Sequence, residues 1–413
     1  MRATSIFRKL IGITSSVVED IRMVGEAVVV SVRLNHRQRD HCGICRRRCP
    51  RYDAGQGRRR WRGLDLGTTR VYLEAEAPRV LCPRHGVRVA AVPWAEHDAR
   101  FTRAFEEQVA WLAVETSKQA VCELMRISWA TVGAILTRVQ RRLDHGPDRL
   151  RGVRRIGIDE ISYRRGQRYL TVVLDHDSGR LLWAAEGRHE ATLLRFFDEL
   201  GAKGCGQITH VSADAANWIA SAVEQRCPNA VRCMDPFHVV AWASMAIDEI
   251  RRQLWNQARR QDPSGRAPHL QGLRWTLLKD PQNLTEAQRS QLTLLEKSNR
   301  SLFRAYMLKE ELRTILSCPY PRLAIDRLQR WLTMAFNSSL DPIIRLATTI
   351  ADHIEPICNT LIHHLSNARV EALNTRIRLI TRRAFGFHSH QPLIALAMLS
   401  FGDSTPALPG RHA

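Results

Sequence analysis

The sequence predicts a multidomain α+β protein, because three parts of the chain carry different residue patterns. Residues 36–95 are rich in Cys, Arg and Gly and contain short strand-like runs. From residue 153 the apolar pattern follows the order β-β-β-α-β-α-β, and residues 240–365 are almost entirely helical in pattern. A chain of 413 residues is too long for one ordinary core, so we expect two to four domains.

The charge balance predicts a polyanionic partner. The chain has 62 Lys and Arg against 41 Asp and Glu, a formal charge of +21. Such a surplus favours nucleic acid as the partner, but it says nothing about sequence specificity. The chain has no uncharged apolar run of about 18 residues, and its N-terminus lacks the apolar core of a signal peptide. We therefore expect a cytoplasmic protein with no membrane partner.

Two short cysteine motifs near the N-terminus predict a metal site. Cys42 and Cys45 are separated by two residues, and so are Cys82 and His85. Three thiolates and an imidazole suit tetrahedral Zn²⁺ in a structural role. His41 and Cys49 are competing ligands. The six other cysteines are scattered and are expected to be buried free thiols.

Residues 103–142 have the pattern of a helix-turn-helix. Residues 117–124 would form the first helix and 125–128 the turn, and Ser128 would cap a recognition helix over 129–138. The N-terminal part of such a helix meets base edges in the major groove. The candidate DNA contacts are Trp129, Thr131 and Arg138. The same pattern also fits any pair of packed helices.

Two aspartates follow predicted strands of the β-β-β-α-β-α-β region. Its strands are expected at 155–158, 168–174, 180–185, 208–212 and 230–234, with helices at 190–200 and 217–225. This is the order of a ribonuclease H-like domain. Asp159 follows the first strand and Asp214 the fourth, so both can meet at one sheet edge. Taken singly, either acid could equally be a helix cap.

A third acid lies on a late helix. Asn367, Glu371, Asn374 and Arg378 share one helical face. Together Asp159, Asp214 and Glu371 could hold two hard divalent cations about 4 Å apart, the arrangement used for in-line phosphoryl transfer. The long gap before Glu371 requires an inserted domain, which residues 240–365 supply. The alternative is a solvent-facing amphipathic helix.

Further polar residues surround these acids in the sequence. Asp235 and His238 follow the fifth predicted strand, where the carboxylate could fix the imidazole tautomer. They could also form a structural turn or a metal half-site, and Asp235 is the alternative to Asp214 as second acid. A basic run after Glu371 fits a surface that contacts DNA backbone, with the candidates Arg376, Arg378, Arg382 and Arg383.

These motifs occur together in few proteins, and the chain resembles the bacterial insertion-sequence transposases of the ISL3 family. The matching segments are Gly157-Ile158-Asp159-Glu160, Arg168-Tyr169-Leu170-Thr171-Val172-Val173-Leu174-Asp175, Pro228-Asn229-Ala230, Asp235-Pro236-Phe237-His238-Val239, Arg369-Val370-Glu371-Ala372-Leu373-Asn374 and Arg382-Arg383-Ala384-Phe385-Gly386-Phe387. The chain departs from the family at His85, where a second Cys-x-x-Cys is usual, and in the small residues that flank Asp214.

The resemblance implies a DDE transposase in which Asp159, Asp214 and Glu371 bind two Mg²⁺ (or Mn²⁺) ions. Water would hydrolyse a phosphodiester at the element end, and the freed 3′-hydroxyl would attack target DNA without a Ser or Tyr nucleophile. Asp235, His238, Asn374 and Arg378 would support this chemistry. The partner would be double-stranded DNA, as terminal inverted repeats and as target, bound by at least a dimer. We expect a nucleoid-associated bacterial protein.

The expected domains follow the motifs. An N-terminal region with a zinc-binding module covers 1–98, and a helix-turn-helix DNA-binding domain covers 99–148. A ribonuclease H-like α/β catalytic core covers 149–239, interrupted by an all-helical insertion at 240–365. The C-terminal helix of the core covers 366–403, and 404–413 is a tail. Two other functions fit: a transposase-derived DNA-binding regulator without cleavage activity, and a nuclease that cuts but does not join.

Overall fold

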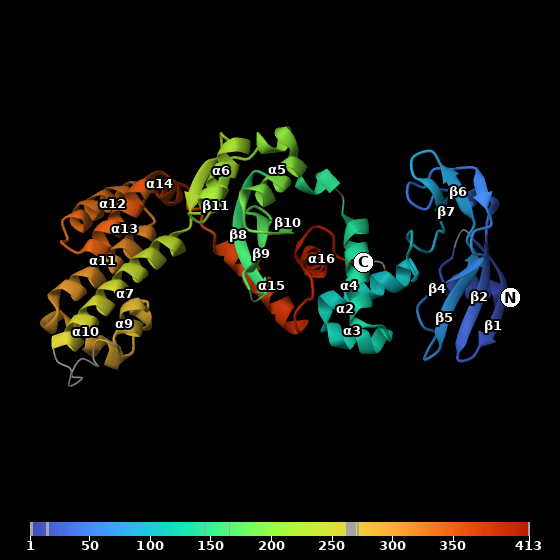
Figure 1. Cartoon of the computed structure of the whole chain (residues 1–413), viewed down its shortest axis with the longest axis horizontal. Coiled ribbons are helices and arrows are strands. Elements are labelled where there is room, and N and C mark those ends of the chain that lie inside the picture. Colours follow the sequence, from blue (N-terminus) through green and yellow to red (C-terminus); the bar gives the residue numbers. More distant parts are fainter. Residues whose placement is uncertain are drawn as a thin grey trace. The chain divides into compact units, whose positions relative to one another are not determined.

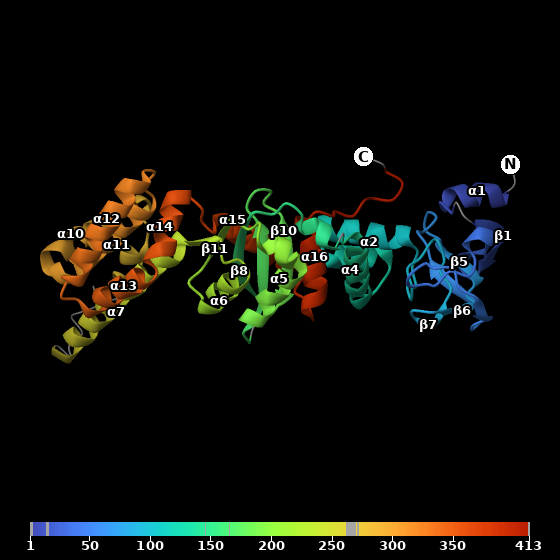
Figure 2. The same cartoon turned by 90° about the horizontal axis from the view of Figure 1, so that it is seen from above.

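The computed structural model describes residues 3–13, 16–144, 146–164, 166–261, 270 and 272–411. The chain forms two compact units, one of residues 1–145 with 380–413 and one of residues 146–379 (Figures 1 and 2). In these described ranges no single helix is long and apolar enough to cross a membrane, although one bent helix pair passes that test by length and composition.

The first unit begins with two small sheets. The larger has the order β1-β2-β5-β4, with β2 and β5 parallel and the other pairs antiparallel. The smaller has the order β3-β6-β7. Alternate residues of β2, including Val28, Val30 and Val32, face a core with Trp61 and Trp94. The elements are α1 (Ala3–Leu10), β1 (Ser16–Val24), β2 (Ala27–Leu34), η1 (His36–Gln38), β3 (Arg51–Asp53), β4 (Arg58–Arg62), β5 (Arg70–Glu76), β6 (Arg79–Cys82) and β7 (Gly86–Val89).

The same unit contains the expected helix-turn-helix. It consists of α2 (Arg103–Glu115), α3 (Lys118–Met125) and α4 (Trp129–Leu143). Ser128 caps α4, since its hydroxyl accepts a hydrogen bond from the Thr131 amide at 3.3 Å. A late helix, α16 (His390–Phe401), packs against α2 and α4. The chain from Ile380 onward therefore belongs to the same compact unit as the helix-turn-helix.

The second unit contains a five-stranded sheet with the order β10-β9-β8-β11-β12. β8, β9 and β10 form an antiparallel meander, and β11 lies parallel to both β8 and β12. The elements are η2 (Gly146–Leu150), β8 (Arg155–Arg164), β9 (Arg168–Asp175), β10 (Leu181–Glu186), α5 (Glu190–Cys205), β11 (His210–Ala213), α6 (Asn217–Arg226) and β12 (Val231–Met234). The predicted order is present, but β8 continues six residues beyond the predicted end at 158 because it pairs with β9 as far as Arg164.

Helices follow β12 for most of the remaining chain. They are α7 (Pro236–Gln261), α9 (Arg274–Leu278), η3 (Pro281–Asn283), α10 (Glu286–Ser298), α11 (Arg300–Leu316), α12 (Pro321–Phe336), α13 (Asp341–Asp352), α14 (Ile354–His363) and α15 (Ala368–Arg383). From α7 to α14 they share one core with Trp331 fully buried, and the Trp331 Nε1 donates to the Leu308 carbonyl at 2.7 Å.

The two faces of the five-stranded sheet have different covers (Figures 1 and 2). Ile156 and Ile158 pack into the core formed with α5 and α6. Gly157 and Asp159 point the opposite way, because side chains alternate along a strand. That face is covered by α15, whose Val370 approaches Gly157 and whose Asn374 binds Asp159.

Candidate functional site

Three aspartates lie at the same level on three adjacent strands of the second unit. Ser212 of β11 pairs with Gly157 of β8, so Asp214 and Asp159 each lie two residues beyond that pair. Ala213 of β11 pairs with Met234 of β12, so Asp214 and Asp235 each follow that pair by one residue. Asp159 lies inside β8 rather than after it, which corrects the sequence prediction. Asp159 still lies next to the point where the parallel neighbouring strand β11 ends.

Asp159 is held by two hydrogen bonds. Its carboxylate accepts from the Asn374 Nδ2 at 2.8 Å and from the Glu160 amide at 2.7 Å. Burial raises the pKa of Asp159 to about 6, and the charge of the neighbouring Asp214 acts in the same direction. A nearby cation would stabilise the ionised form of this carboxylate, which burial disfavours.

Glu371 on α15 and Asp235 after β12 are neighbours. Burial raises the pKa of Glu371, and the charge of Asp235 raises it further. Burial also raises the pKa of Asp235, against the opposing effect of His238, whose Nε2 lies 4.0 Å from the carboxylate. Asp235 also accepts from the Phe237 amide at 3.4 Å at the start of α7, so it caps that helix as well as lying beside Glu371.

A chain of buried polar groups attaches the start of α15 to the sheet. The Asn367 Nδ2 donates to the Ile158 carbonyl at 3.1 Å, and the Ser212 hydroxyl donates to the Asn367 Oδ1. The Ser212 oxygen also lies 2.7 Å from the His176 Nε2. Asn367 and Asn374 are buried and Glu371 is half-buried, whereas Arg378 is exposed, so this face packs against the sheet over most of its length rather than facing solvent.

Gly157 makes the close approach of α15 possible. A Cβ at this position would lie 2.4 Å from the Val370 Cγ2 and 2.8 Å from the His176 Nε2. Sequence reasoning quoted Gly157 only as part of a motif and assigned no role to His176 or Ser212. A glycine inside an otherwise apolar strand was the available signal, since it often marks the close approach of another chain segment.

The acids fit divalent cations by chemistry, although they are not tightly gathered. The Asp235 Oδ2 and the Asn374 Oδ1 are buried without hydrogen-bond partners among the described residues, and carboxylate and amide oxygens are ligands that hard cations prefer. However, only the Cys/His group near the N-terminus, within the described part of the chain, has three or more ligand atoms all within 4.8 Å of one another.

The Cys/His group consists of the four predicted zinc ligands. The His85 Nδ1 lies 3.7 Å from the Cys42 Sγ and 3.5 Å from the Cys82 Sγ, and the Cys45 and Cys82 sulfurs are 3.7 Å apart. Although burial favours the thiol, backbone amides of Arg84 and His85 help to lower the pKa of Cys82 to about 6. These separations suit a tetrahedral ion with sulfur ligands at about 2.3 Å.

The competing zinc ligands lie outside this group. Cys49 donates to the Arg47 carbonyl at 3.3 Å, and the His41 Nδ1 lies 2.8 Å from the Arg39 carbonyl oxygen. Burial raises the pKa of Cys49, so this residue is a buried thiol beside the group.

The predicted DNA contacts of the helix-turn-helix have different surroundings. Trp129 and Thr131 lie half-buried in the first turn of α4, and the Thr131 hydroxyl is 2.8 Å from that of Ser128. The Lys118 ammonium lies 4.5 Å from the centre of the Trp129 ring. Arg138 binds the fully buried Glu106 at 2.8 Å, so its guanidinium is engaged inside the unit.

The basic residues after Glu371 are mostly exposed. Arg376, Arg378 and Arg382 lie on the surface of α15. Arg383 is half-buried and donates to the Val114 carbonyl at 2.5 Å, at the end of α2. It therefore anchors the C-terminal segment to the helix-turn-helix.

Models of known protein families match nearly all of these parts of the chain. A model of the zinc finger of transposases IS204/IS1001/IS1096/IS1165 matches residues 38–85, and one of the helix-turn-helix domain of transposase family ISL3 matches 90–140. A third model, of the ISL3 DDE domain and described as "Transposase", matches 156–397.

Two relatives match most of the chain. The whole chain is 50% identical to the transposase for insertion sequence element IS1557 of Mycobacterium tuberculosis and covers 98% of that protein. Over 81% of its length it is 28% identical to the transposase for insertion sequence element IS1001 of Bordetella parapertussis, of which it covers 82%.

Proposed function

The chain belongs to the ISL3 family of insertion-sequence transposases, and on that premise we propose that it cleaves DNA at element ends and joins them to target DNA. The observation that carries the proposal is the common level of Asp159, Asp214 and Asp235 on adjacent strands, with Glu371 presented by α15. Such a convergence of acids from distant parts of the chain is typical of a site for phosphoryl transfer.

In this proposal Asp159, Asp214 and Glu371 hold two divalent cations, Mg²⁺ or Mn²⁺. The raised pKa values of Asp159 and Glu371 support it, because burial and the charges of neighbouring acids destabilise their ionised forms, which bound cations would stabilise. The ions would supply Lewis acidity toward the phosphodiester and would lower the pKa of the attacking water. Asn374 holds the Asp159 carboxylate in position, and Asp235 with His238 supports Glu371.

The proposed DNA interface has two parts. Trp129 and Thr131 in the first turn of α4 would meet the bases of the terminal inverted repeats. Arg376, Arg378 and Arg382 on α15 would contact phosphates near the reacting bond. Arg138 and Arg383 have packing roles instead, because their guanidinium groups are bound within the first unit. The Cys/His group would hold a structural Zn²⁺, and two DNA ends held together would require at least a dimer.

The decisive experiment is a cleavage assay on duplex DNA that carries the element end. We expect wild-type protein to nick this DNA only with Mg²⁺ or Mn²⁺, and Glu371→Gln to lose at least about 100-fold in rate. Glu355→Gln, an exposed glutamate of α14, is the matched control and is expected to cleave like wild type.

The outcomes separate the alternatives. Wild-type protein that binds the end but never nicks it would be a DNA-binding regulator, and cleavage without joining of a pre-cut end would be a nuclease. Asp214→Asn and Asp235→Asn, compared in the same assay, test the choice of second acid. The larger loss is expected for Asp214.

A further inference from the structure

An arginine-lined cavity lies beside β4, the edge strand of the larger sheet in the first unit. Its volume is about 800 Å³. Six arginines line it against a single acid, Asp98, whose side chain is 77% exposed. The arginines are Arg58, Arg59, Arg60, Arg62, Arg79 and Arg100. They come from β4, from β6 and from the segment that precedes α2, so three separate parts of the chain converge on one hollow.

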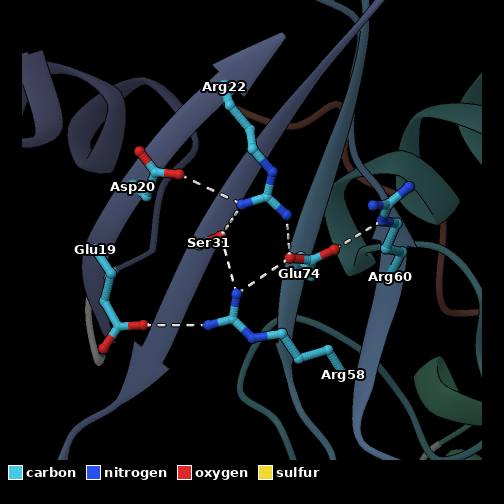
Figure 3. A network of polar contacts seen from close by, with 7 residues as sticks. All are labelled: Glu19, Asp20, Arg22, Ser31, Arg58, Arg60 and Glu74. Carbon is cyan, nitrogen blue, oxygen red and sulfur yellow. Dashed lines mark hydrogen bonds and ion pairs between the residues drawn. The ribbon is translucent and has the colours of Figure 1, made fainter. Parts of the chain in front are cut away.

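The strand that carries four of these arginines is held by a polar network on one face of the sheet (Figure 3). Glu74 of β5 accepts from the Arg60 Nε at 2.8 Å, from the Arg58 Nη1 at 3.2 Å and from the Arg22 Nη2 at 2.5 Å. Although burial favours protonation, these hydrogen bonds hold the pKa of Glu74 below its ordinary value. Glu19 and Asp20 complete the network.

Four of the wall arginines have acidic partners behind the cavity wall, and two do not. Arg58 and Arg60 pair with acids of the network, Arg62 pairs with Asp65 and Arg79 pairs with Asp53. None of Glu19, Asp20 and Glu74 lines the cavity. Arg60 remains 48% exposed beyond its bond to Glu74. Arg100 is exposed. Its carbonyl accepts from the Arg62 amide at 2.9 Å, but its guanidinium has no hydrogen-bond or ion-pair partner among the described residues. The Arg59 Nη2 donates to the Ala99 carbonyl at 2.8 Å, and because this partner is neutral the charge of Arg59 stays uncompensated.

Protection of the sheet edge is a simpler explanation for basic residues on β4. Charged side chains on an edge strand prevent pairing with other chains. That explanation requires arginines on β4 alone. Arg79 of β6 is placed by its ion pair with Asp53, but edge protection gives no reason for Arg100 to line the same hollow. Edge protection also works with either sign of charge, whereas the charged side chains that line this cavity are six arginines and one aspartate.

We propose that this cavity binds the phosphodiester backbone of duplex DNA as a second contact surface of the DNA-binding unit. The inference rests on the proposed function, which supplies DNA as the partner. Arginine suits this role because its planar fork can donate two hydrogen bonds to one phosphate. Backbone contacts of this kind position a protein on DNA without reading its sequence.

The helix-turn-helix borders the same cavity. Ile127, in the turn between α3 and α4, is among the lining residues. The Arg62 Nη1 donates to the Arg126 carbonyl of this turn at 3.0 Å, and Asp65 binds both arginines. DNA whose bases meet the first turn of α4 can therefore place its flanking phosphates against β4.

The test is the salt dependence of DNA binding by the full chain with EDTA present, so that cleavage plays no part. The probe is a labelled duplex that carries the element end, followed by fluorescence anisotropy. Arg60→Ala/Arg100→Ala removes two exposed arginines, and Glu74 keeps Arg22 and Arg58 as partners. The plot of log affinity against log salt is expected to lose about 1.8 of its slope, since each phosphate contact contributes about 0.9.

Two further variants make the result specific. Arg8→Ala/Arg37→Ala removes the same charge from exposed positions outside the cavity wall and is expected to change the slope by less than half as much. Arg60→Lys/Arg100→Lys keeps the charge and is expected to keep the slope while losing affinity a few-fold, because lysine cannot bind a phosphate in a fork.

Equal slope loss in the cavity and control variants would overturn the proposal, because the effect would then be one of general charge. An unchanged slope in the cavity variant would overturn it too. If the double alanine variant loses its thermal transition, the single variant Arg100→Ala decides the question, and its slope is expected to fall by about 0.9. Wild type that binds but never cleaves would refute only the proposed function.

Discussion

The Cys/His group of the first unit and the carboxylates of the second unit differ in how the chain brings them together. The Cys/His group comes from two short motifs on small sheets, and its four ligand atoms lie within 4.8 Å of one another. The acids come from separate strands and from a helix more than 130 residues further along the chain, and they lie near the ends of β11 and β12 without such close contact. Thiols and a neutral imidazole can pack together before a metal binds, whereas carboxylates repel one another.

This contrast predicts opposite effects of removing a ligand. The largest is expected at the Cys/His group, where Cys82→Ser should abolish zinc binding and cost several kcal/mol or more in the stability of the first unit. Zinc content per chain and hydrogen exchange in β6 and β7 measure the effect. Cys49→Ser is the control, because Cys49 is buried beside the group but belongs to no ligand pair. Equal zinc loss in both variants would show that the ligand set is wrong.

Acid is expected to weaken the second unit through His176. Burial, with help from the charge of Arg369, lowers the pKa of His176 to about 4. The unfolded chain therefore takes up a proton first, so stability is complete above about pH 6.5 and falls as the pH drops toward 4, by roughly 3 kcal/mol. Hydrogen exchange in β8 and β11 measures this loss. His176→Gln should flatten the pH dependence, and an unchanged slope would assign it to another group.

The approach of α15 to the sheet can be tested through Gly157. The Cβ of Gly157→Ala would overlap Val370, so we expect a loss of about 1–3 kcal/mol together with reduced cleavage as Glu371 is displaced. Adding Val370→Ala to the same chain should restore part of the stability and part of the cleavage activity. Gly206→Ala is the control, since its added Cβ would come no closer than 3.5 Å to another atom. Thermal unfolding and the cleavage assay give the two readouts, and loss of stability without rescue would argue against this contact.

The smallest effect is a gain in stability at the acids. Because the pKa of Asp159 is raised from 3.8 to about 6, its charge destabilises the metal-free folded state above pH 6. Asp159→Asn should therefore stabilise the metal-free protein by about 1–2 kcal/mol at pH 8, while it abolishes cleavage. The gain should disappear below about pH 4, where the carboxyl is protonated in both states. A loss of stability at pH 8 would contradict the argument that burial, with the charge of Asp214, destabilises the ionised carboxylate.

Local sequence patterns predicted most helices and strands and the residues of the Cys/His group. The β-β-β-α-β-α-β order, the helix-turn-helix with its Ser128 cap and the two Cys-containing motifs all appear as expected. Each helix, strand and Cys-containing motif depends on residues near one another in sequence, whereas the meeting of the two motifs joins residues 43 positions apart. The length of β8 was wrong because its far half is stabilised only by pairing with β9. The bond from Arg138 to the buried Glu106 was not predicted, because these residues lie 32 positions apart.

By itself, the sequence determined which side chains could bind metal, which segments would be strands or helices, and the excess of positive charge. Periodicity, caps and ligand spacing are local properties of the chain. Only the tertiary structure decided that Asp159, Asp214 and Asp235 share one level, that Gly157 admits α15, and that arginines of β4, β6 and the segment before α2 surround one cavity. Strand register and helix packing depend on contacts between residues far apart in sequence, and no local pattern encodes those contacts.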